Sequence, residues 1–209
     1  MIELADIQSK EKFIKLCQFD WDYAQLIDDF LSVKALSVPT PYGYHLLNIN
    51  YSDVDSEHTP CHQHLSAENK HLLKGNNDAF YRTYKATNIR RPWRMKPYTL
   101  RAVSDIRNVL LPLGLDAAHI RYYYMPKQFV LSAHSDIHDP VDDENWDYEI
   151  CHIPLKTNDN TFVIIDREIF FMSDVGGVYK MRQDLNHTAG NADGYEDRIQ
   201  LTFKIIKPL

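Results

Sequence analysis

Two residues with metal-binding side chains follow an apolar run in the second half of the chain. The run extends from Phe129 to Leu131, and His134 and Asp136 come shortly after it. On an extended strand, residues two apart point to the same face of the sheet. This imidazole and this carboxylate can therefore reach one metal ion together. Both residue types are common, so the pair becomes informative only with further ligands.

A second histidine and an arginine stand further along the chain. His187 is followed by Arg198, where a strand pattern begins. Two histidines and one carboxylate form the facial triad of non-haem Fe(II) sites, which leaves positions open for a chelating cosubstrate and dioxygen. A planar guanidinium grips a carboxylate with two hydrogen bonds. Arg198 therefore suits the far end of a dicarboxylate whose 2-oxo acid end binds the iron.

The order of these motifs resembles the Fe(II)/2-oxoglutarate oxygenases, and within them the aspartyl/asparaginyl β-hydroxylase family. Four motifs between residues 120 and 209 carry the resemblance: the strand from Ile120 to Pro126 leading to His134-Ser135-Asp136, the segment from Cys151 to Leu155, the glycine turn and strand from Gly176 to His187, and the segment from Asp197 to Leu201. The resemblance implies a double-stranded β-helix (jelly roll, cupin-like) that hydroxylates a C–H bond with Fe(II), 2-oxoglutarate as cosubstrate and O2.

The resemblance also gives roles to single residues. It implies that the iron ligands, and so the catalytic residues, are His134, Asp136 and His187. It further implies a cosubstrate site in which the distal carboxylate of 2-oxoglutarate pairs with Arg198, and to which His152 and Tyr123 contribute contacts.

Two departures from the family pattern concern the cosubstrate. The family has an arginine two residues before the histidine that His152 matches, and this chain has Ile150 there. One cation is therefore missing, or Arg121 or another residue replaces it. The spacing from His187 to Arg198 is also longer by about one residue, which the turn from Gly190 to Gly194 can absorb.

The expected substrate is an amino-acid side chain, free or in a peptide or protein. A small metabolite or a nucleobase is the second possibility, and a cupin-like binding module without turnover is the rival from another class. Seven acidic residues lie between Asp136 and Glu149. They form either a solvated loop or a lid that selects a cationic substrate.

Two other histidine clusters compete as metal ligands. His138 and Asp139 directly follow the first motif, but their distance from the apolar strand favours a place in the following loop. A second cluster combines a cysteine with three histidines: His58, Cys61, His62 and His64. No second half-site with zinc spacing follows it, which favours a polar loop over a zinc site.

Composition limits the partners and the compartment. The 209 residues carry a net charge of −6, so generic nucleic-acid binding is not favoured. Eight basic residues with interleaved aromatics lie between Arg82 and Arg107, and we interpret them as a solvated face.

Three cysteines without a CxxC pair fit a reducing compartment. With no signal peptide or membrane-length apolar run, a cytoplasmic location is expected; the oligomeric state stays open.

The elements that must position these residues are mainly β. We expect an α+β chain, mainly β, folded as a single domain over 1–209, with a helical or mixed N-terminal annex over 1–115 and a jelly-roll core over 116–209. Helices are expected over 8–34, with Asp20 capping the second, and over 104–111, capped by Ser104 and ended by Gly114. Strands are expected over 44–51, 119–125, 129–133, 148–155, 161–164, 169–172, 177–181 and 198–206, with an irregular stretch over 52–77.

Overall fold

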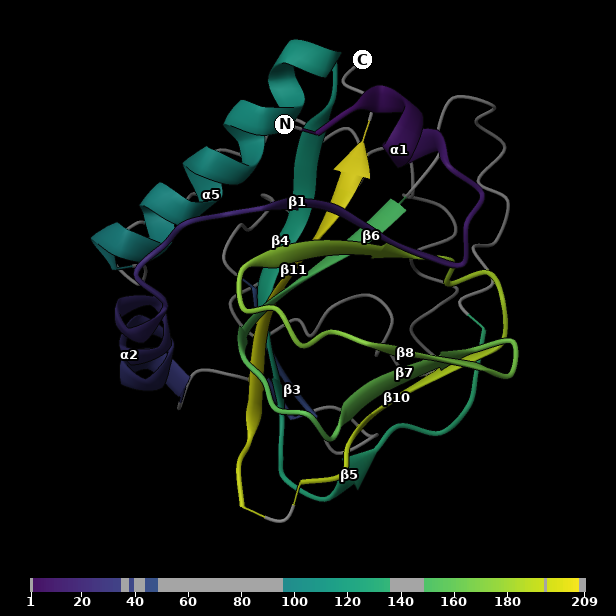
Figure 1. The fold of residues 1–209 in the computed structure, drawn as a ribbon. Coiled ribbons are helices and arrows are strands. Elements are labelled where there is room, and N and C mark those ends of the chain that lie inside the picture. The colour runs from purple at the N-terminus through teal and green to yellow at the C-terminus, as the bar shows by residue number, and fades with distance from the viewer. Residues whose placement is uncertain are drawn as a thin grey trace, which may run out of the picture.

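The computed structural model describes residues 2–34, 38–39, 44–48, 96–135, 149–193 and 195–206. In this part of the chain the fold is mainly β, with two antiparallel sheets and helices packed on one of them (Figure 1). None of the helices described is long and apolar enough to cross a membrane.

The helices are α1 (Leu4–Gln8), α2 (Tyr23–Val33), α5 (Pro97–Leu110) and the short 3-10 helix η4 (Leu111–Leu113). The larger sheet has seven strands in the spatial order β1 (Phe13–Gln18), β9 (Gly177–Met181), β6 (Glu149–Lys156), β11 (Arg198–Ile206), β4 (Asp116–Met125), β3 (His45–Asn48) and β2 (Val38–Pro39). The smaller sheet has four strands in the order β5 (Phe129–Val130), β10 (His187–Asn191), β7 (Thr161–Ile165) and β8 (Glu168–Phe171).

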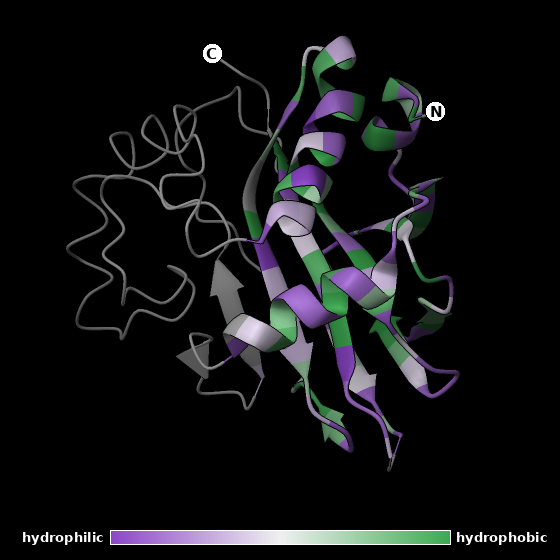
Figure 2. Ribbon diagram, turned by 90° about the vertical axis from the view of Figure 1, so that its left-hand side faces the viewer, coloured by the Kyte–Doolittle hydropathy of each residue, from purple (hydrophilic) through white to green (hydrophobic). Residues whose placement is uncertain are grey.

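The central strand β11 gives the larger sheet two different faces, because its residues alternate between apolar and polar. The apolar residues belong to the main core, which they share with α2 and α5 on the outer face of the sheet (Figure 2): Ile199, Leu201, Phe203 and Ile205. The polar residues between them are also buried, on the opposite face: Arg198, Gln200, Thr202 and Lys204. Period-two alternation therefore separates helix packing from a polar inner face.

A second core cluster lies between the two sheets. Val163 and Ile165 of β7 pack there with Tyr179 and Met181 of β9. All five residues of β9 are buried, as expected for a strand that is covered on both faces. The inner face of the larger sheet thus looks toward the smaller sheet, and the polar residues of β11 lie on that side.

The predicted helix over 104–111 is longer in the structure and begins at Pro97. Its start is stabilised from another element, because the Asp29 carboxylate of α2 accepts a hydrogen bond from the Thr99 backbone N–H at 3.1 Å. Proline at the first helical position is also favourable. Ser104 is therefore inside the helix and not its cap, whereas Gly114 does end the segment, with φ of +71°.

The predicted helical stretch over 8–34 is wrong in its first half. Residues Phe13–Gln18 form the edge strand β1, paired with β9. The apolar residues there fit either period, and pairing with β9 satisfies the backbone as a strand. The second half is helical, but Asp22 caps α2 by accepting from the Gln25 backbone N–H at 3.0 Å, in place of Asp20.

Candidate active site

The two predicted histidine ligands lie directly opposite each other. His134 and His187 form an isolated antiparallel bridge in which each backbone N–H donates to the other's carbonyl, at 2.9 and 2.7 Å. Directly opposite residues project to the same face. Their ring centroids are accordingly 4.4 Å apart. The structure therefore brings together two side chains that are 53 positions apart in the sequence.

Both imidazoles are held by the same kind of contact. The Nδ1 of His134 lies 2.8 Å from the Ser132 carbonyl oxygen, and the Nδ1 of His187 lies 2.9 Å from the Leu185 carbonyl oxygen. A carbonyl only accepts, so Nδ1 carries the proton in both rings. The lone pair is then on Nε2, the arrangement that a metal-ligating histidine needs. The pair fits a divalent metal ion.

The third predicted ligand, Asp136, lies outside the described residues, as do His138, the cluster from His58 to His64 and most of the acidic segment. Within the described ranges, no group of three or more His, Cys, Asp or Glu side chains gathers into a metal site. The triad thus stays a prediction, and the structure shows that its two histidines face each other.

Arg198 is the predicted carboxylate-binding residue, and it is 1% exposed. One of its terminal nitrogens donates to Gln200 Oε1 at 2.7 Å and lies 3.0 Å from Met172 Sδ, while Nε has no hydrogen-bond partner. No carboxylate of the described residues contributes to its charge environment; burial lowers its pKa to about 10, and Tyr123 partly opposes this. The arginine is therefore a buried cation with unused donor capacity, which suits an anionic ligand.

His152 lies next to this arginine on the polar inner face. Its Nδ1 is 3.1 Å from Gln200 Nε2, and its Nε2 is 3.1 Å from Gln183 Nε2. Burial, and then the charges of Arg198, Arg121 and His187, lower the pKa of His152 to about 3. The ring is thus neutral at ordinary pH.

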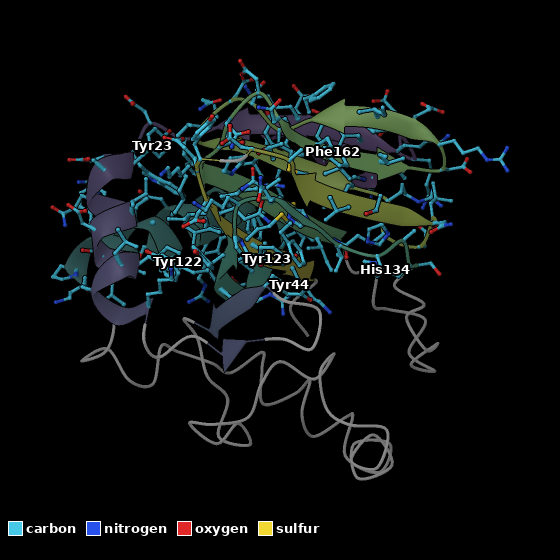
Figure 3. The ribbon with its side chains drawn as sticks, turned by 90° about the horizontal axis from the view of Figure 1, so that it is seen from below. Tyr23, Tyr44, Tyr122, Tyr123, His134 and Phe162 are labelled. Carbon is cyan, nitrogen blue, oxygen red and sulfur yellow. The ribbon has the colours of Figure 1, made fainter. Side chains whose placement is uncertain are left out.

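Tyr123 lies on the inner face of β4, and its neighbour in sequence lies on the other face. Its ring stacks on Tyr44 with centroids 4.5 Å apart, whereas Tyr122 packs toward α2 against Phe30 (Figure 3). The register places Tyr123 across from Gln200 of β11. The structure therefore brings Tyr123 to the arginine side of the sheet. Its contact with the cosubstrate stays a prediction.

Two basic residues lie near Ile150, the position at which the family pattern has an arginine. Lys204 of β11 pairs with Ile150 across the sheet and is 7% exposed. Arg121 of β4 is also buried. It pairs across the sheet with Thr202 of β11 and donates a hydrogen bond to the Thr202 hydroxyl at 3.1 Å. Two cations thus lie close to the position where the family pattern has its arginine.

The two glutamines that contact His152 were not expected from the sequence. Gln200 follows Arg198 by two residues, so the period-two argument applied to His134 and Asp136 could have found it. Gln183 lies in the turn after β9, where no periodicity marks a side chain.

Comparison with known proteins identifies the fold and no closer relationship. A scan against protein-family models finds no match, and no curated protein matches the chain. Among solved structures, the chain is similar to a Pseudomonas putida prolyl-4-hydroxylase, with a TM-score of 0.52 and 14% identity over 98% of this chain and 97% of that one. It is also similar to an oxidoreductase of the 2OG-Fe(II) oxygenase family from Burkholderia pseudomallei, with a TM-score of 0.50 and 12% identity over 97% and 88% of the two chains.

These similarities show that the chain shares the fold of 2-oxoglutarate–Fe(II) oxygenases. This agrees with the broad class expected from the motifs. The narrower resemblance to the aspartyl/asparaginyl β-hydroxylases stays a prediction.

Proposed function

We propose that this chain is an Fe(II)- and 2-oxoglutarate-dependent dioxygenase that hydroxylates a C–H bond. His134, Asp136 and His187 are the proposed iron ligands. Bound iron would supply the activation of O2, coupled to oxidation of the 2-oxo acid to succinate and carbon dioxide. The protein's own contribution is to hold the ligands and orient the cosubstrate.

The observation that carries the proposal is the facing pair His134 and His187. Their 4.4 Å separation and their matching Nδ1 contacts direct two lone pairs into one region. A purely structural histidine pair has no need for both rings to adopt this tautomer. Asp136, two residues after His134, is in the right position in the sequence to complete the set.

The buried arginine supports the cosubstrate assignment. We propose that Arg198 binds the distal carboxylate of 2-oxoglutarate with Tyr123 as a further contact, and that His152 lines this end of the site, where its ring nitrogens hold Gln200 and Gln183. An uncompensated buried guanidinium is costly, and a bound carboxylate relieves that cost. Lys204 and Arg121, near Ile150, add positive charge on the same face, which keeps a dicarboxylate favourable although the family arginine is absent.

We further propose that the two sheets form a double-stranded β-helix within a single domain. In this arrangement α2 and α5 belong to an N-terminal annex that covers the outer face of the larger sheet. The proposed substrate is an amino-acid side chain, free or in a peptide or protein. The similarity in fold to a prolyl-4-hydroxylase is consistent with that class.

The test is succinate formation from 2-oxoglutarate in the presence of Fe(II) and ascorbate. Wild type is expected to form succinate slowly even without its substrate, and His134→Ala and Arg198→Ala are expected to lose this activity. Arg101→Ala, at an exposed position of α5, is the matched control and is expected to keep the activity. A wild type that binds neither iron nor 2-oxoglutarate would instead support the non-catalytic binding module.

A further inference from the structure

A continuous chain of side-chain contacts runs across the polar inner face from Arg198 to Gln183. Arg198 contacts Gln200 at 2.7 Å, Gln200 contacts His152 at 3.1 Å, and His152 contacts Gln183 at 3.1 Å. Gln183 is 9% exposed and Gln200 is 2% exposed. The four side chains thus form one polar network, in which His152 is half-buried and the other three residues are buried. The positions of its protons follow from the arginine at one end.

The guanidinium of Arg198 fixes the direction of every bond in this network, because it can only donate. Gln200 therefore presents Oε1 to the arginine and Nε2 to the ring of His152. The Nδ1 of His152 must then accept, and in a neutral imidazole the proton is on Nε2.

Gln183 must consequently present its oxygen to His152. As drawn, Gln183 Nε2 lies beside the ring Nε2, which would oppose two donors, and Gln183 Oε1 is buried without a partner. The oxygen and nitrogen of an amide are assigned from the hydrogen-bond network. Turning the amide over satisfies His152 and moves the Gln183 NH2 group to the buried position that has no partner.

Two buried donors then lack an acceptor in the same network: the Nε of Arg198 and the amide of Gln183. Buried polar groups are nearly always satisfied, so two unsatisfied donors in one network call for an explanation, and a bound ligand is one. Both groups donate, so the missing partner is an acceptor. A carboxylate or carbonyl oxygen next to a guanidinium has that chemistry.

We propose that Gln183 is a cosubstrate-binding residue, which donates its amide N–H to an oxygen of the 2-oxo acid held by Arg198. His152 is then a positioning residue: both of its ring nitrogens are used by Gln200 and Gln183, and it holds the Gln183 amide in the donating orientation. The inference rests on the proposed function, since it takes 2-oxoglutarate as the ligand of Arg198.

The test compares two substitutions of Gln183. One keeps the size of the side chain and adds a negative charge, and the other removes its polar contacts without adding charge. Gln183→Glu keeps the size of the side chain and still accepts from His152, but it replaces the donor with a negative charge. Gln183→Leu loses both contacts without adding charge. The matched control is Gln8→Glu, the same chemical change at an exposed position. Binding of 2-oxoglutarate to the Fe(II)-loaded protein is measured by calorimetry without oxygen, so turnover is not needed.

The expected order of 2-oxoglutarate affinity is wild type above Gln183→Leu above Gln183→Glu, with a loss of at least about tenfold for the glutamate variant. Fe(II) affinity and Gln8→Glu are expected to be unchanged. A structural role would give the reverse order, because the near-isosteric glutamate would be the milder change. Equal affinities, or the reverse order, would overturn this inference alone. A wild type that does not bind 2-oxoglutarate would overturn the proposed function and this inference with it.

Discussion

Hydrogen-bond direction is the most informative property of single residues in this site. His134 and His187 have their protons placed by backbone carbonyls, and His152 has its proton placed by a chain that begins at an arginine. These constraints determine which nitrogen can bind a metal and which amide can bind an anion. Residue identity alone gives neither.

Arg198 is expected to lower the stability of the ligand-free protein. Arg198→Met removes a buried charge that has no carboxylate partner among the described residues, and methionine fills a similar volume next to Met172. The free energy of unfolding should stay the same or rise by about 1 kcal/mol, while 2-oxoglutarate affinity falls by about a hundredfold. Urea unfolding and calorimetry measure the two effects, and Arg198→Lys is the charge-retaining control. A large fall in stability would show that the guanidinium is a structural group.

His152 is expected to make the protein sensitive to mild acid. Its pKa is about 3 in the folded chain against 6.5 in an unfolded one, so the unfolded state binds the additional proton between these values. Stability is therefore highest above pH 6.5 and falls as the pH drops toward 3, by up to about 1.4 kcal/mol per pH unit from this group. Denaturation in urea from pH 7 to pH 4.5 measures the slope. In His152→Gln the slope should be shallower; an unchanged slope would assign it to other groups.

The secondary structure elements differ in how far their own residues determine where they begin and end. The strands β7, β8, β9 and β11 agree with their predicted ranges to within one residue. The strand β11 alternates between apolar and polar residues, the other three are mostly apolar, and turn residues bound each of them. The helix start at Pro97 and the strand β1 did not follow from local pattern. Both depend on partners distant in sequence.

The N-terminus of α5 provides a test of such a distant partner. Asp29, 5% exposed, accepts from the backbone N–H and the hydroxyl of Thr99, both at 3.1 Å. Asp29→Ala removes the cap and leaves buried donors unsatisfied, which should destabilise the protein by about 1–3 kcal/mol. Asp28→Ala, exposed on the same helix, is the matched control and should change stability by less than about 0.5 kcal/mol. Urea denaturation compares them, and equal effects would argue against the cap.

The sequence singled out His134, His187 and Arg198 because their chemistry is specific and their spacing follows strand periodicity. The structure places the two histidines opposite each other and buries the arginine, and their roles as ligands stay predictions. Gln183 was not found, because its role depends on the orientation of an amide in a turn, which is determined by three other side chains. Local pattern carries no information on such a contact.

At the scale of the whole molecule, the two sheets are joined by residues of the site. Arg198 of the larger sheet contacts Met172, a member of the core cluster between the sheets. In the smaller sheet, His187 of β10 pairs with His134, which follows β5. A ligand that binds in this region would contact segments that are far apart in the chain. Binding should therefore stabilise the fold as a whole.

Metal binding is expected to raise the melting temperature. At a free Fe(II) or Mn(II) concentration about a hundred times Kd, the stabilisation is about 2.7 kcal/mol, which corresponds to roughly 5–10 °C for a chain of this length. Chelation should reverse the shift. His187→Ala should abolish it, and His62→Ala should leave it unchanged. Loss of the shift in His62→Ala alone would place the metal in the competing histidine cluster.

The alternation along β11 has a consequence for mutational tolerance. Positions 199, 201, 203 and 205 face the helices, so substitutions there should be limited by hydrophobicity and size, and should reduce the amount of folded protein. Positions 198, 200 and 202 face the site, so many replacements there should fold normally and yet be inactive. A saturation library of β11, scored separately for protein abundance and for activity, should therefore alternate along the strand. Substitutions at the odd positions should lower abundance, and those at the even positions should lower activity alone.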